Sequence, residues 1–184
     1  AAAPADAAPA APAGDRWVVQ PGTSSISFVG AKVTKTHKGG FGDFTGEAVI
    51  ADGKPVSTSF TVQMASLWAD EQNPAEGTGP YKLTGHLKSP DFFDVDAHPT
   101  ADFASTSIRA ADGDNAWSVT GNLTMHGKTN EVTFPATIEV APDAVRASAS
   151  FKINRHDWAI SYPGKPDDLI KDDVALSLDF NLGR

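Results

Sequence analysis

The sequence predicts an all-β fold, an extended antiparallel barrel of eight strands with one short helical insertion between strands. Three observations point to this fold. From Arg16 onward, apolar and polar residues alternate with a period of two, as they do in half-buried strands. Gly, Asp, Asn and Pro interrupt the alternation at the short intervals typical of hairpins. Consecutive strands at this spacing favour a closed barrel or a sandwich, and closure removes the exposed edges of long strands.

The composition limits the size of the protein and the kinds of partner it can have. With 184 residues, 40% of them hydrophobic, the chain suits one domain with a substantial core. Cysteine is absent, so packing alone must hold the fold and thiolate chemistry is excluded. The formal net charge of -8 and the lack of a basic run argue against nucleic acid as a partner. No apolar stretch reaches the roughly 18–20 residues of an integral membrane span.

The first residues differ in composition from the rest of the chain. Residues 1–13 contain only Ala, Pro and Asp6, and side chains this small cannot offset the entropy lost on ordering. Residues 1–15 are therefore expected to form a flexible Ala/Pro-rich tether, and residues 16–184 the barrel domain. The alternative for the N-terminal segment is a frayed Ala-rich helix or a remnant of cloning.

The alternation is carried by eight segments, which are predicted strands. They are 26–33, 44–50, 58–64, 102–109, 117–125, 131–140, 145–155 and 174–182. Asp-Gly pairs after the second and fourth segments indicate turns. The glycine-rich segment 38–42 has no following helix that would receive a phosphate, so it is expected to be another turn.

The rhythm changes between the third and fourth strands, where a helix is predicted. Leu83 and Leu87 are four residues apart within the segment 80–89, a spacing that places both on one helical face. Ser89 and the proline after it resemble the start of a second turn, with Ser89 as its N-cap. This turn would carry Phe92 and Phe93 toward the core.

An eight-stranded barrel is just wide enough to be filled by side chains or to hold one ligand. The positions predicted to face inward mix large and small residues, a pattern that permits an elongated apolar cavity and equally a filled, tapering barrel. The candidate cavity-lining residues are Phe28, Phe60, Met64, Leu87, Phe92, Phe93, Phe103, Trp117, Leu123, Met125, Phe134, Phe151, Ile153, Arg155, Trp158, Leu178 and Phe180.

Arg155 breaks the pattern of its own strand. A period of two places it on the apolar face with Phe151 and Ile153, where an unpaired guanidinium would be very costly. The favoured partner is a nearby carboxylate, and the candidates are Asp157, Asp167, Asp168, Asp172 and Asp173. The alternatives are the polar head group of a ligand, or a strand end or bulge at Asn154 that turns the side chain outward.

No arrangement of residues predicts enzyme chemistry. The five histidines are His37, His86, His98, His126 and His156, and no two of them have the spacing of a zinc site. His156 and Asp157 are adjacent, but their presence beside abundant serines does not define a triad. The paired aspartates of residues 167–173 lie in a loop with Pro and Gly, where their charges are expected to be solvated. The prediction is therefore a protein with no catalytic residue, no metal and no resident cofactor.

Several segments together resemble one known family. They are Trp17 with Ser25-Ile26-Ser27-Phe28, then 40–46, 85–95, 98–103, 121–129 and 153–155, with 162–170 similar to a loop of one branch. On these segments, which cover nearly all of residues 17–182, the sequence resembles the YceI-like family of secreted bacterial lipid-binding proteins. Trp68 and the stretch 71–79 depart from the shorter connection of many members, and a stretch folded over the mouth would change ligand access.

The resemblance implies a lipocalin-like barrel that encloses a polyisoprenoid, a quinone or a similar long-chain amphiphile for storage or transport. It implies a periplasmic or secreted location, with a lipoprotein anchor or a removed leader at the N-terminus as options, and it leaves a homodimer open. The alternative function is a structural or partner-binding protein of the cell envelope with a filled barrel. An exposed apolar patch around Trp68 would favour that alternative.

Overall fold

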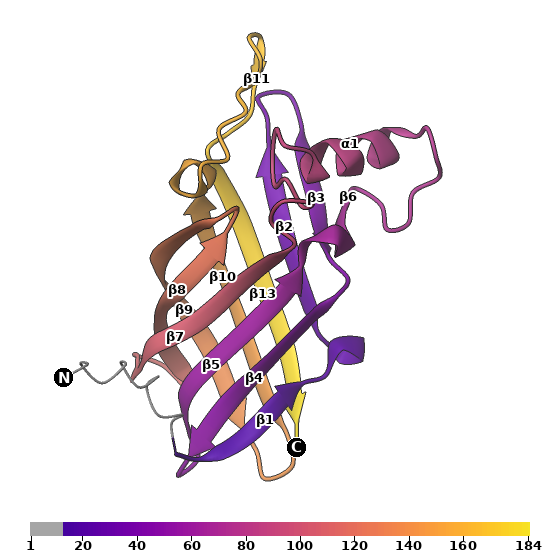
Figure 1. Cartoon of the computed structure of the whole chain (residues 1–184). Helices are drawn as coiled ribbons and strands as arrows, with labels where there is room; N and C mark the ends of the chain where they lie inside the picture. Colours follow the sequence, from indigo (N-terminus) through magenta and orange to yellow (C-terminus); the bar gives the residue numbers. More distant parts are fainter. Residues whose placement is uncertain (1–12) are drawn as a thin grey trace, which may run out of the picture.

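The computed structural model describes residues 13–184, in which a closed antiparallel barrel of eight strands is the main feature (Figure 1). The barrel strands, in the order in which they pair, are β1 (Asp15–Val19), β4 (Phe44–Ala51), β5 (Lys54–Gln63), β7 (Thr100–Ala110), β8 (Ala116–Met125), β9 (Lys128–Val140), β10 (Val145–Asn154) and β13 (Asp173–Gly183). Strand β13 pairs back onto β1 and closes the barrel. The predicted fold class is therefore confirmed.

Three further strands extend the sheet at one end of the barrel. They are β2 (Ser25–Ala31), β3 (Thr36–Phe41) and β6 (Leu67–Ala69), which pair in that order. The first predicted strand, 26–33, corresponds to β2, but β1 rather than β2 closes the barrel. Strand β13 pairs with β1 near its C-terminal end and with β2 along its first half, because the short helix η1 (Pro21–Thr23) divides the two segments.

The segment 38–42 was expected to be a turn, and this prediction is wrong. Residues 38–41 belong to β3, which pairs on both sides. Glycine is required there because the sheet is crowded. A Cβ on Gly39 would lie 2.3 Å from the carbonyl oxygen of Trp68 and 2.4 Å from the ring of Phe28.

The helix α1 (Gly79–Lys88) agrees with the predicted helix 80–89. Thr78 is its N-cap and accepts a hydrogen bond from the backbone N–H of Tyr81. The backbone N–H of Ala69 donates to the Thr84 hydroxyl at 3.1 Å and ties the helix to β6. Ser89 ends this helix as its C-cap and does not begin a second one, but the turn that follows does place Phe92 in the core.

The sheet has one gap that a short helix fills. Strands β9 and β10 pair only between residues 136–140 and 145–149, and they separate beyond this point. The helix η3 (Arg155–Trp158) packs against β9, where Asn130 donates a hydrogen bond to the Asp157 carbonyl at 2.6 Å. The strand predicted as 145–155 therefore ends one residue early, at Asn154.

The predicted domain boundary lies partly outside the described residues. Of the expected tether 1–15, residues 1–12 are not described, and Asp15 already pairs with Ile50 in β1. No helix within residues 13–184 is long and apolar enough to cross a membrane.

Candidate ligand-binding cavity

The barrel contains an apolar cavity of about 320 Å³, within the range of small-molecule sites. It lies at the end that carries α1 and the hairpin of β11 (Gly164–Lys165) and β12 (Asp168–Leu169), which Figure 1 shows at the top. We call this the upper cavity. Its walls come from barrel strands, from α1 and the turn after it, and from the loop of residues 159–172, called the mouth loop below.

Most of the residues predicted to line a cavity lie on the wall of the upper cavity. These are Phe28, Phe60, Met64, Leu87, Phe92, Phe93, Phe103, Leu123, Met125, Phe151, Ile153, Arg155 and Leu178. For the residues on strands, the shared location follows from the alternation, which sends every second side chain of a strand to the interior. Met64, Leu87, Phe92, Phe93 and Arg155 lie on helices or turns outside the strands. Contact between any of these wall residues and a ligand stays a prediction.

Four of the predicted residues lie elsewhere. Phe134 and Phe180 line a second, smaller cavity of about 50 Å³, called the lower cavity, near the opposite end of the barrel. Trp117 is partly buried against the core and lines neither cavity. Trp158 is 2% exposed in η3 and donates its indole N–H to the carbonyl of Leu123 at 3.0 Å. It fills the gap beside β9, so its assignment to the cavity wall is corrected.

The structure adds residues that the sequence analysis did not single out as lining. Those on strands include Ile26, Val62, Ala101, Val132, Val174 and Leu176, each of which shares its face with a predicted residue. Those on the mouth loop include Ile160, Tyr162 and Ile170, for which no periodic signal exists. The polar lining residues Lys32, Lys165, Asp168 and Lys171 all lie at the mouth end.

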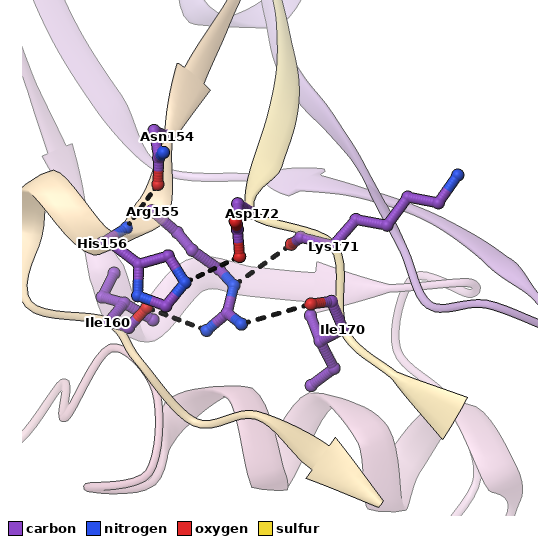
Figure 2. Close-up of polar contacts among 7 residues, drawn as sticks. All are labelled: Asn154, Arg155, His156, Ile160, Ile170, Lys171 and Asp172. Carbon is purple, nitrogen blue, oxygen red and sulfur yellow. Dashed lines mark hydrogen bonds and ion pairs between the residues drawn. The ribbon is translucent and has the colours of Figure 1, made fainter. Parts of the chain in front are cut away.

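Arg155 is buried and is bound by backbone carbonyls rather than by a carboxylate (Figure 2). Its Nε donates to the carbonyl of Lys171 at 3.1 Å. Its two terminal nitrogens donate to the carbonyls of Ile160 at 2.8 Å and Ile170 at 3.4 Å. All three acceptors belong to the mouth loop, so Arg155 fastens this loop to the end of β10.

The expected ion pair of Arg155 is therefore wrong. Among residues 13–184 the Arg155 guanidinium lies within ion-pair distance of no carboxylate, and Asp172 binds His156 at 2.7 Å instead (Figure 2). Burial lowers the pKa of Arg155, and the negative charge of Asp172 opposes this shift without cancelling it. The side chain remains a cation at neutral pH because arginine titrates far above that range. Carbonyl dipoles thus supply the solvation that burial removes.

A second contact holds the outer part of the mouth loop. Lys32 forms an ion pair of 3.0 Å with Asp168, and Thr34 donates to the same carboxylate through both its hydroxyl and its backbone N–H. Asp168 was expected to be solvated, and instead it joins the loop to the turn between β2 and β3. Desolvation raises the pKa of Asp168, but the hydrogen bonds from Lys32 and Thr34 outweigh it and hold the pKa below the usual 3.8.

Replacing Asp168 by Asn is expected to remove a pH-dependent part of the stability. A lowered pKa in the folded state means that the contact stabilises the protein fully above pH 3.8 and is lost as the pH falls through the lowered value. Urea unfolding of the two proteins should give a constant difference near neutral pH that shrinks below pH 3.8. Asp167→Asn removes the same charge at an exposed neighbour, and an equal pH-dependent difference there would contradict the prediction.

Histidine side chains also join neighbouring elements at the mouth. His37 lies 2.7 Å from Asp70, and His86 lies 3.0 Å from Asp91. The His86 ring also packs edge-on against Phe92 and Tyr162, with centroids about 5 Å apart. The contact between His86 and Tyr162 connects α1 to the mouth loop. No group of three or more potential metal ligands occurs in the part of the chain that the structure describes.

The stretch 71–79 does not close the mouth. None of its residues lines the cavity, and Figure 1 shows the connection from β6 to α1 looping outside the helix, away from the barrel. Trp68 is half-buried over Gly40. Trp68 is not one of the exposed large apolar side chains of residues 13–184.

Residues 17–182 match the YceI-like domain family. A UPF0312 protein of Pseudomonas putida is 34% identical over 146 residues, which are 75% of this chain and 71% of that protein. Among solved structures, Burkholderia cenocepacia BcnA has a TM-score of 0.75 at 24% identity, over 89% of this chain and 98% of its own. A polyisoprenoid binding domain from Saccharophagus degradans has a TM-score of 0.70 at 13% identity, over 91% and 97%. These structural similarities show a shared fold.

Proposed function

The chain belongs to the YceI-like domain family, and on this premise we propose that it is an exported binding protein that encloses a polyisoprenoid or a similar long-chain amphiphile for storage or transport. The observation that carries the proposal is the upper cavity, whose deep walls are aliphatic and aromatic while its charged residues lie at the mouth. Apolar chains gain roughly 25 cal/mol for each Å² removed from water. A polar head group would remain beside the charged mouth.

The relative with a stated ligand supports this choice of chemical class. The domain from Saccharophagus degradans that shares the fold is described as binding a polyisoprenoid. Binding requires no covalent step, and the proposal includes no turnover. Export, to the periplasm or beyond, and any N-terminal anchor are parts of the proposal that cell fractionation of the native host tests.

Extraction and ligand binding test the proposal directly. Solvent extraction of the purified protein, followed by mass spectrometry, is expected to release a long-chain lipid, and the delipidated protein should bind added octaprenol. Ala101→Leu fills the upper cavity and is expected to weaken octaprenol binding about tenfold. Ala104→Leu, on the exposed face of the same strand, is the matched control. If the protein releases no lipid and binds no octaprenol, the proposal is refuted. If both variants bind octaprenol equally, the upper cavity is not the ligand site.

A further inference from the structure

The upper and lower cavities are separated by a continuous layer of phenylalanine rings. Ring contacts run from Phe44 to Phe180, then to Phe60, Phe103, Phe134 and Phe151, with centroids 4.4–5.9 Å apart. These six residues come from six different barrel strands. We call this set the phenylalanine layer, and it crosses the interior of the barrel.

The two cavities contact opposite sides of this layer. Phe103 and Phe151 line only the upper cavity, and Phe134 and Phe180 line only the lower one. Phe60 lines both. Its ring stacks on Phe103 at 5.1 Å and meets Phe180 edge-on at 5.6 Å, so it occupies the junction between the cavities.

The surroundings of the layer leave room beyond it. The lower cavity is bordered by the small residues Ala48, Ala136, Ala147 and Ala149. Removing the Phe60 ring would join this space to the upper cavity. Leu178 is the other residue that lines both cavities, and it lies on β13 beside the same junction.

We propose that the phenylalanine layer limits the length of the hydrocarbon chain that the barrel accepts, with Phe60 as the residue that sets the limit. The inference rests on the proposed function. The charged residues lie at the mouth, so an amphiphile enters with its chain pointing toward Phe60 and its head toward Lys32 and Lys171. Each further carbon atom of the ligand raises its affinity as long as that atom is buried in the cavity. Units that would extend past the layer must remain outside the mouth and contribute nothing.

Competition among chain lengths tests this limit. The delipidated protein is offered an equimolar mixture of farnesol, geranylgeraniol, hexaprenol, octaprenol and solanesol from detergent micelles, and native mass spectrometry identifies the bound alcohols. The wild-type protein is expected to favour one length. Phe60→Ala should shift the preferred alcohol to the next longer one in the mixture and raise the ratio of longer to shorter bound alcohols about tenfold, as expected when about two further carbon atoms of the chain become buried.

Two control variants isolate the layer from a general loosening of the barrel. Trp117→Ala removes a large aromatic side chain that packs against the core but lines neither cavity and lies outside the layer. It should leave the preferred length unchanged. Ala149→Leu partly fills the lower cavity, and combined with Phe60→Ala it should restore the wild-type preference.

The outcomes separate this inference from the proposed function. If folded Phe60→Ala binds isoprenoid alcohols with the wild-type distribution, the layer sets no limit and the inference fails while the proposed function stands. If neither protein binds any of the alcohols, the proposed function fails first. Should Phe60→Ala not fold, as judged by circular dichroism, Phe60→Leu and Leu178→Ala open the same junction and carry the test.

Discussion

Replacing Arg155 by Ala is expected to lower the free energy of unfolding by about 3–5 kcal/mol, because its two shorter hydrogen bonds to carbonyls are lost and bonds to a charged group contribute about 1.5–3 kcal/mol each. The variant leaves the carbonyls of Ile160, Ile170 and Lys171 without their donor. It also leaves a void, because Arg155 is 5% exposed. Urea unfolding followed by tryptophan fluorescence measures the loss.

A local readout distinguishes loss of the mouth loop from general destabilisation. Hydrogen exchange should become faster at Ile170 and Lys171, whose backbone N–H groups donate to the carbonyls of Pro163 and Ala31, before it changes in β8. Lys152→Ala, on the exposed face of the preceding strand β10, is the control and should stay within about 0.5 kcal/mol of wild type. Arg155→Lys should fall between the two, because an ammonium cannot reach three carbonyls in fork geometry. An Arg155→Ala protein as stable as the control would contradict this account.

Replacing Trp158 by Ala is expected to cost a further large fraction of the stability, about 3–5 kcal/mol. The side chain is 2% exposed and fills the place where β9 and β10 separate. Its backbone carbonyl also accepts a hydrogen bond from His126 Nδ1 at 2.8 Å. Loss of the indole would leave a cavity at the place where β9 and β10 form no hydrogen bonds with each other. Thermal unfolding with a calorimeter provides the measurement.

Trp158→Phe separates packing from the indole hydrogen bond. It removes the N–H that donates to Leu123 and should cost about 1 kcal/mol plus the effect of the smaller ring. Asp157→Ala, at the exposed neighbouring position, should change stability little. Because Trp158 lies outside the cavity wall, a folded Trp158→Phe protein should bind octaprenol as tightly as wild type. If folded Trp158→Phe loses octaprenol binding, Trp158 belongs to the ligand site after all.

The alternation predicted the long strands well because each has one face in the interior and one in water. It could not predict β3 or β6. Gly39 and Gly40 in β3 carry no side chain to alternate, and β6 has only three residues. The strand β1 is short and is followed directly by Pro21 and Gly22, which read as a loop.

The same periodicity explains which of the predicted strand residues lie on the wall of the upper cavity. A period of two determines the face of a strand but not the depth along the barrel, so Phe134 and Phe180 face inward as predicted yet lie below the upper cavity. Depth depends on the stagger of neighbouring strands, which is a property of the whole barrel. Trp158 lies on no strand, so the argument from faces did not apply to it.

For Arg155, the sequence predicted burial and the need for a partner, but not the partner itself. Five aspartates follow it within a short distance in the sequence and were the obvious candidates. Every residue has a backbone carbonyl, so the sequence does not indicate which carbonyls will bind Arg155. Backbone carbonyls become suitable acceptors only when the loop folds back over the end of β10. This contact depends on the tertiary path of the chain, and no local pattern encodes it.

The pairing of β1 with β13 determines how late in folding the barrel can close. Val18 and Val19 pair with Gly183 and Leu182, so the contact that completes the barrel joins residues from opposite ends of the described chain. Strand β13 also provides an edge for β2 and β10. Closing so long a loop has a high entropic cost and is therefore slow. The ribosome must also synthesise residues 173–183 before β1, β2 and β10 can pair with β13. Until then the backbone N–H and C=O groups on one edge of β2 and of β10 remain unpaired, and the nascent chain is prone to aggregation during this interval.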